Sequence, residues 1–127
     1  MKSLLVVFSV LFAYPAVVSA QDVTAEEMNV VAIKIRARHG FPAQQLDETL
    51  CKIADRWAER IAKTGKLVHG GGEQIIAMGY KTKEAVFNAW MQSKGHRKWI
   101  LSKTTRCGFS CRTNKSGKRF WVGVYRK

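Results

Sequence analysis

The sequence predicts an α+β protein, a three-layer α-β-α sandwich built around a small, mainly antiparallel sheet. Three observations support this fold class. Three segments carry apolar residues at the spacing that is typical of amphipathic helices. The C-terminal part carries two strand-like runs separated by a turn at 114–117. The last run, FWVGVY at 120–125, is apolar on both faces, so we expect both sides of the sheet to be covered.

The N-terminus has the pattern of a secretory signal peptide. Lys2 supplies a positive charge, LLVVFSVLFAY supplies an apolar core, and small residues follow at 18–20. We therefore expect residues 1–20 to be removed by cleavage after Ala20, which leaves one exported domain at 21–127, extracellular or periplasmic. The alternative is an uncleaved membrane anchor, against which Pro15 and the small residues argue. No later stretch is apolar for long enough to span a bilayer.

The expected mature chain carries a strong positive charge. Without Lys2 it holds 21 basic and 9 acidic residues, a net charge of +12. Such a surface attracts polyanions, so we expect an anionic lipid, a glycan or another polyanion as partner. The basic residues are scattered from Lys34 to Lys127, and no specific nucleic-acid motif is visible. This pattern favours a general positive field over a dedicated nucleic-acid groove, and its alternative role is solubility.

Two helices are expected before the glycine run at 70–72. The first begins with a capping box at Thr24 and ends at Gly40. His39 is expected on the surface or as a C-terminal cap of this helix, rather than as a ligand. The second lies between an N-cap at Asp47 and a stop signal at Gly65. Its wide apolar face consists of Leu50, Ile53, Ala54, Trp57, Ala58 and Ile61.

A third helix is expected between its cap at Thr82 and Gly95, with Val86 and Trp90 as its inward anchors. The segment that follows it, HRKWILSK at 96–103, is expected to be irregular or a single helical turn. The expected strands are 74–77, 106–113 and 119–125.

The chain contains three cysteines: Cys51, Cys107 and Cys111. An oxidising exterior allows one disulfide and leaves one thiol. On one strand, the Cα atoms of Cys107 and Cys111 are about 13 Å apart, at about 3.3 Å per residue. A disulfide requires less than about 7 Å. A bridge would therefore join Cys51 to one of the other two, and the alternative is that all three are small core residues.

Four polar side chains stand at or near the glycine run. His69 and Glu73 flank it, Glu84 lies in the first turn of the third helix, and His96 follows the expected end of that helix. Two imidazoles and two carboxylates that share one cleft can bind a divalent cation or transfer protons. The alternatives are a tight turn for the glycines, a favourable helix start for Glu84 and a cap for His96. The spacing alone does not show that the four side chains converge.

Four stretches of the sequence resemble the CAP superfamily, also called SCP domains, which includes cysteine-rich secretory proteins, antigen 5 and pathogenesis-related proteins. The stretches are LDETLCKIADRWAERIAKTGKLVH, GEQIIAMGY, EAVFNAWMQSKGHRKWIL and GFSCRTNKSGKRFWVGVY. The most specific piece, WMQSKGHRKWIL, resembles the family's tryptophan-led helix with its Gly-His-Arg and Ile-Leu segment. The chain is identified as a small exported member of bacterial type, with a CAP domain at 21–127. The resemblance also implies an α-β-α sandwich.

The resemblance further implies a tetrad of two histidines and two glutamates in a central cleft. Matched residue by residue, the tetrad falls on His69, Glu73, Glu84 and His96. In family members the two histidines hold zinc or another divalent cation, so His69 and His96 are the expected metal ligands. This sequence departs from the family in a very short loop between His69 and Glu73, and in Gln74 where asparagine is usual. We expect the three glycines to let so short a loop aim both side chains inward, and the alternative is a remodelled cleft with weak metal affinity.

The resemblance implies no shared catalytic activity. We therefore expect a secreted, non-enzymatic module whose cleft binds a divalent cation and whose basic surface meets an anionic ligand such as lipid or polysaccharide. The alternative is a metal-dependent, peptidase-like hydrolase in which Glu73 or Glu84 acts as general base on a metal-bound water. In a third hypothesis the tetrad is structural and only holds the loops together.

Overall fold

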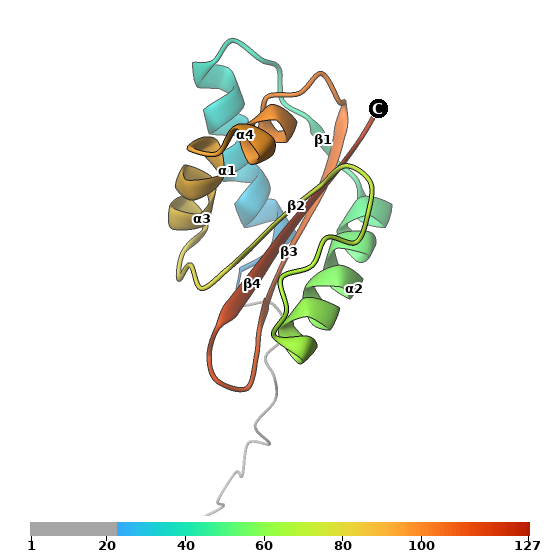
Figure 1. The fold of residues 1–127 in the computed structure, drawn as a ribbon. Helices are drawn as coiled ribbons and strands as arrows, with labels where there is room; N and C mark the ends of the chain where they lie inside the picture. Colours follow the sequence, from blue (N-terminus) through green and yellow to red (C-terminus); the bar gives the residue numbers. More distant parts are fainter. Residues whose placement is uncertain (1–22) are drawn as a thin grey trace, which may run out of the picture.

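In the computed structural model, which describes residues 23–127, four helices cover the two faces of a four-stranded sheet (Figure 1). The helix α2 covers one face, and α1, α3 and α4 cover the other. The expected signal peptide at 1–20 lies outside the described residues. The predicted α-β-α sandwich is confirmed. The elements are α1 (Ala25–Arg38), β1 (Gln45–Leu46), α2 (Glu48–Thr64), β2 (Gln74–Met78), α3 (Lys83–Met91), α4 (Lys94–Ile100), β3 (Arg106–Thr113) and β4 (Arg119–Arg126).

The sheet has the strand order β1-β3-β4-β2. The strands β3 and β4 form the predicted antiparallel hairpin, and β2 pairs antiparallel with β4 on its other side. The short strand β1 pairs in parallel with β3, where Leu46 lies opposite Cys107. This strand was not predicted, because two residues are too few to show a period of two. The sheet is therefore mainly antiparallel, as expected.

Local capping sets the ends of α1 and α2. The Thr24 side chain accepts a hydrogen bond from the backbone N–H of Glu27 at 3.1 Å. Asp47 accepts from the N–H of Leu50 at 3.0 Å, and Gly65 ends α2 with a left-handed φ of 69°. His39 is the exposed C-cap of α1, as predicted. These helix boundaries follow from interactions within four residues along the chain.

The third predicted helix is wrong at its C-terminal end. The helix α3 ends at Met91, and the segment expected to be irregular or a single helical turn belongs largely to a separate helix of seven residues, α4. The break is a tight turn in which the N–H of Gln92 bonds to the carbonyl of Ala89, and the N–H of Ser93 to that of Trp90. His96 therefore lies inside a helix rather than after one.

Apolar side chains fill both spaces between the layers. The predicted anchors Val86 and Trp90 are fully buried. On the second helix, the predicted apolar face is too wide, because Ile53 is 39% exposed. The buried stripe of α2 consists of Leu50, Ala54, Ala58 and Ile61. The small side chains of Ala54 and Ala58 let α2 approach the sheet closely. Ile53 lies beside this stripe and outside the contact.

The cysteines are thiols that pack as small core residues. Cys107 and Cys111 are buried, and Cys51 is half-buried against the same cluster. Burial raises the pKa of the Cys107 thiol to about 12. Of the two sequence-based alternatives, the structure therefore shows packing.

Within residues 23–127, no helix is both long enough and apolar enough to cross a membrane.

Candidate functional site

The loop from α2 to β2 carries His69 and Glu73 and depends on its three glycines. Gly70 lies against the ring of Trp57, and an added Cβ would come within 2.8 Å of that ring. The next two glycines have φ values of +93° and +75°, in the left-handed region that favours glycine. Close contact thus requires the first glycine, and backbone conformation requires the other two.

Two hydrogen bonds hold this loop against the fold. The indole Nε1 of Trp57 donates to the carbonyl of Val68 at 2.9 Å. The N–H of Gly70 donates to the side-chain oxygen of Gln74 at 2.7 Å, and Gln74 is buried. The amide of Gln74 therefore closes the loop on itself. This contact gives a structural role to the residue that departs from the family's usual asparagine.

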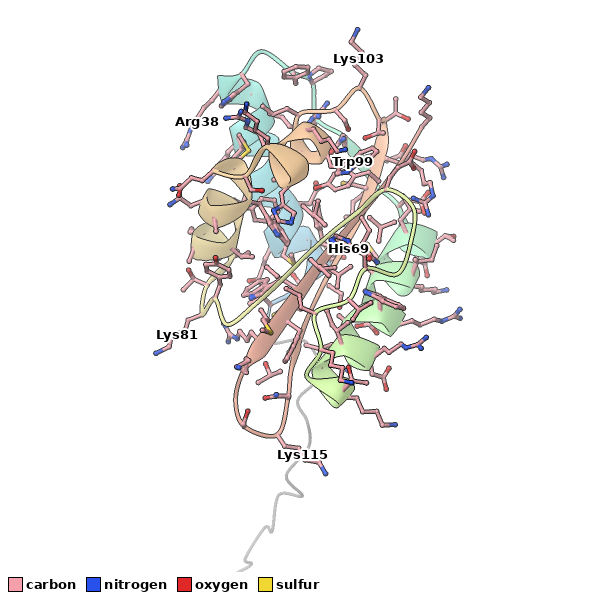
Figure 2. The ribbon with its side chains drawn as sticks, in the orientation of Figure 1. Arg38, His69, Lys81, Trp99, Lys103 and Lys115 are labelled. Atoms are coloured by element: carbon pink, nitrogen blue, oxygen red, sulfur yellow. The ribbon has the colours of Figure 1, made fainter. Side chains whose placement is uncertain are left out.

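The charge of His69 reaches His96 although the two histidines lie on different elements. His69 is exposed on the loop, where Figure 2 marks it, and His96 is half-buried on α4. Burial lowers the pKa of His96, and the positive charge of a protonated His69 lowers it further. The two imidazoles are therefore within electrostatic reach of each other. A lowered pKa favours the neutral imidazole, which is the form that binds metal ions.

Glu73 is paired with an arginine that the sequence analysis did not identify. Its carboxylate Oε2 lies 3.2 Å from Nη1 of Arg126, at the end of β4. Its backbone carbonyl accepts a hydrogen bond from the N–H of Tyr125 at 2.9 Å. Nothing in the spacing of the two residues along the chain indicates this pair, because it arises from the pairing of β2 with β4. The carboxylate is committed to Arg126.

Within residues 23–127, Glu84 does not join the two histidines in a group of three possible metal ligands. It occupies the first turn of α3, and the nine residues of this helix rise about 13 Å before α4 begins. Its carboxylate lies 3.2 Å from Nζ of Lys83 and is exposed. A hydrogen bond from its own backbone N–H and the contact with Lys83 lower the pKa of Glu84. It also lines a groove of about 420 Å³ with Lys34 of α1 and with His39, the C-cap of that helix.

The structure therefore assembles the predicted tetrad only in part. It brings His69 and His96 within electrostatic reach, it places Glu73 beside Arg126, and it leaves Glu84 at the start of α3. Within residues 23–127, no three histidine, cysteine, aspartate or glutamate side chains come close enough together to hold a metal ion. That the glycine loop aims both of its polar side chains into one cleft stays a prediction. His69 is exposed, and Glu73 turns to β4.

Comparisons with known proteins agree with this fold. The sequence profile of the Cysteine-rich secretory protein family, CAP, matches residues 33–125. This match covers most of the chain, and the chain belongs to the CAP family.

Individual relatives are more distant. Secreted protein RBT4 of Candida albicans is 36% identical over 64 residues, which are 49% of this chain and 18% of that protein. An outer surface protein from Borrelia burgdorferi superposes with a TM-score of 0.72 at 19% identity, over 80% of this chain and 92% of that one. An extracellular SCP-domain protein from Bacillus anthracis superposes with a TM-score of 0.69 at 17% identity, over 84% of this chain and 41% of that one. At these identities the solved structures show a shared fold.

Proposed function

We propose that this chain is an exported CAP-domain binding module. In this proposal His69 and His96 bind a divalent cation, and the basic surface binds an anionic ligand. The observation that carries the metal part is the electrostatic influence between two imidazoles on separate elements. Imidazole nitrogens suit zinc, which is the first ion to test. When bound, the cation would offer an anionic ligand a positive contact in addition to the basic surface.

A pair of imidazole ligands fits a zinc site of low affinity better than one of high affinity. Structural zinc sites usually have four protein ligands, and this pair supplies two imidazoles. Neither glutamate of the expected tetrad completes the set, because Glu73 pairs with Arg126 and Glu84 pairs with Lys83. The remaining positions would belong to water or to ligand oxygens. We therefore expect binding that is measurable and readily reversed by a chelator.

Calorimetry tests the metal site. Zinc titrated into the full chain is expected to release heat, and His69→Ala/His96→Ala is expected to abolish that heat. The matched control is His39→Ala, which removes an exposed histidine from the C-cap of α1 and should leave the heat unchanged. Equal heats from the wild type and the double variant would refute the proposal.

Export is supported by the N-terminal signal pattern and by the descriptions of the matched relatives as secreted, outer-surface or extracellular. Expression with the native N-terminus is expected to give an exported protein whose sequence begins at Gln21. Recovery of an uncleaved chain in the membrane fraction would instead support the anchor alternative.

The structure gives no specific support to a hydrolase. A general base must lie within hydrogen-bond reach of the water that it activates. The carboxylate of Glu73 is committed to Arg126, and Glu84 stands at the far end of α3 from the helix that carries His96. A screen with peptide and ester substrates is therefore expected to find no turnover. Turnover that disappears both with a chelator and in Glu73→Gln/Glu84→Gln would overturn this part of the proposal.

A further inference from the structure

Two hollows flank the turn that joins β3 to β4. The first, of about 630 Å³, lies between the turn and the C-terminal half of α2. The second, of about 490 Å³, lies between the turn and the segment 79–81 that follows β2. Thr113 and Ser116 line both hollows, so the two adjoin across the turn. Figure 2 shows Lys115 at the tip of this hairpin, Lys81 at the same end and Lys103 at the opposite end of the molecule.

The charge around these hollows is strongly positive. Lys63 and Lys115 line the first hollow, and Lys81 and Lys118 line the second. Among the lining residues, Glu59 is the single acidic one. None of the four lysines forms an ion pair within residues 23–127. The positive charge at this end of the fold is therefore available to a ligand.

Hydrogen bonds hold the backbone that carries these lysines. The N–H of Gly79 donates to the carbonyl of Arg119 at 2.9 Å, and the guanidinium of Arg119 donates back to the carbonyl of Lys81. The indole of Trp121 donates to the carbonyl of Tyr80 at 2.9 Å.

The turn itself is closed by a side chain. Asn114 Oδ1 accepts from the N–H groups of Ser116 and Lys118 at 3.1 and 2.9 Å. Because the frame is already ordered, a ligand would order only the lysine side chains, which lowers the entropic cost of binding.

We infer that this hairpin end is the part of the basic surface that binds the anionic ligand, and that the ligand is an acidic polysaccharide carrying carboxylate or sulfate groups. The inference rests on the proposed function and locates the site of the anionic ligand in it. Beside Lys115, the Nδ2 group of Asn114 can donate to sugar hydroxyls and the Oγ of Ser116 can accept from them, while Asn114 Oδ1 stays bonded within the turn. The ring of Tyr80, 38% exposed beside the second hollow, offers an apolar face to a sugar ring.

The shape of this end favours a glycan chain over other polyanions. Two hollows on either side of a projecting turn suit a flexible chain that bends around it, whereas a bilayer presents a flat surface. Proteins that bind single-stranded nucleic acid use several aromatic rings on which successive bases stack. Here a single exposed tyrosine lines the hollows.

Heparin affinity chromatography of the full chain with a sodium chloride gradient, in the presence of EDTA, tests the location. The test variant is Lys81→Gln/Lys115→Gln/Lys118→Gln. The matched control, Lys34→Gln/Lys94→Gln/Lys103→Gln, removes the same charge from exposed lysines elsewhere that form no ion pair within residues 23–127. At fixed salt the test variant is expected to lose roughly ten times more affinity than the control. Its salt dependence should fall by about one counterion per lysine contact. Equal losses would show a delocalised field and overturn the inference.

Two further measurements keep the result interpretable. The thermal midpoint of each variant shows whether it is folded, and Lys115→Gln alone, at the tip of the turn, provides a minimal version. DNA and vesicles of phosphatidylcholine with phosphatidylserine are the competing ligands, and tighter binding to either one through the same lysines would overturn the glycan assignment. His69→Ala/His96→Ala is expected to retain heparin binding in EDTA, so failure of the metal site and failure of the glycan site are distinguishable.

Discussion

The two faces of the sheet are packed in different ways. On the α2 face, small residues bring backbone against backbone. A Cβ added at Gly108 of β3 would lie 2.2 Å from the carbonyl carbon of Leu50. On the other face, aromatic rings of Phe87, Trp90 and Phe109 meet edge to face, with centroids 5.1 and 5.6 Å apart. A side chain can shift when its neighbour grows, whereas the backbone of a helix cannot.

The contrast in packing indicates where the fold tolerates change. The α2 face is a rigid contact that is also tied by polar groups, since Asp55 on α2 binds both Ser110 and Arg112 on β3. The α1, α3 and α4 face is a larger, side-chain-mediated core that also carries the helix with His96. The α2 face should therefore respond most strongly to a single added methyl group.

The largest loss of stability is expected when an alanine replaces a glycine on the α2 face, and the same change on the other face serves as the comparison. Gly108→Ala is expected to cost more than about 4 kcal/mol, enough to prevent stable folding, because its new methyl group meets helix backbone. Gly123→Ala meets side chains instead, Ile75 at 3.0 Å and Phe109 at 3.1 Å. It should cost about 1–2 kcal/mol. Urea denaturation measures both, and the reverse order would contradict the assigned difference between the faces.

The next effect concerns the polar tie of the α2 face. Asp55→Ala is expected to cost about 2 kcal/mol, because it leaves the partly buried Arg112 without its carboxylate, which lies as close as 2.6 Å. The pair is a quarter exposed, which holds the cost below that of a fully buried pair. In a double-mutant cycle with Arg112→Ala, the double variant should lose less stability than the sum of the singles. If the stability losses of the two single variants simply add in the double variant, Asp55 and Arg112 do not stabilise each other.

A smaller effect appears in acid. The N–H of Leu50 and then the side chain of Arg106 lower the pKa of Asp47, which caps α2. The folded state therefore binds this proton less readily, and the resulting stability is present above the ordinary pKa of about 3.9. It is lost as the pH falls through the lower folded value. Asp47→Asn should melt at a lower temperature than the wild type at pH 6, and the two should converge near pH 2. A constant difference would contradict this assignment.

The weakest effect lies on the outer side of the same helix. Ile53→Ala is expected to change stability by no more than about 0.5 kcal/mol, because the side chain lies outside the α2 contact. Ile61→Ala, the same change at a buried position of the stripe, should cost about 2–4 kcal/mol. Similar losses at the two positions would mean that the apolar face of α2 is as wide as the sequence suggested.

Features that depend on neighbouring residues could be predicted without the structure. Thr24, Asp47 and Thr82 cap their helices as expected, because a cap needs partners no more than a few residues away. The hairpin and the layer order followed from alternation and from an apolar last strand. The family followed from the motifs at 84–101 and 108–125.

Contacts between distant segments became visible only in the folded chain. The fold broke the third helix after Met91, added β1 beside β3, and placed Arg126 beside Glu73. Within residues 23–127 it also left the four polar residues without a group of three that could hold a metal ion, although motif order had put all four into one cleft. Pairing between distant segments such as β2 and β4 depends on how the helices pack and on which strands become neighbours, and the local spacing of residues does not fix either one.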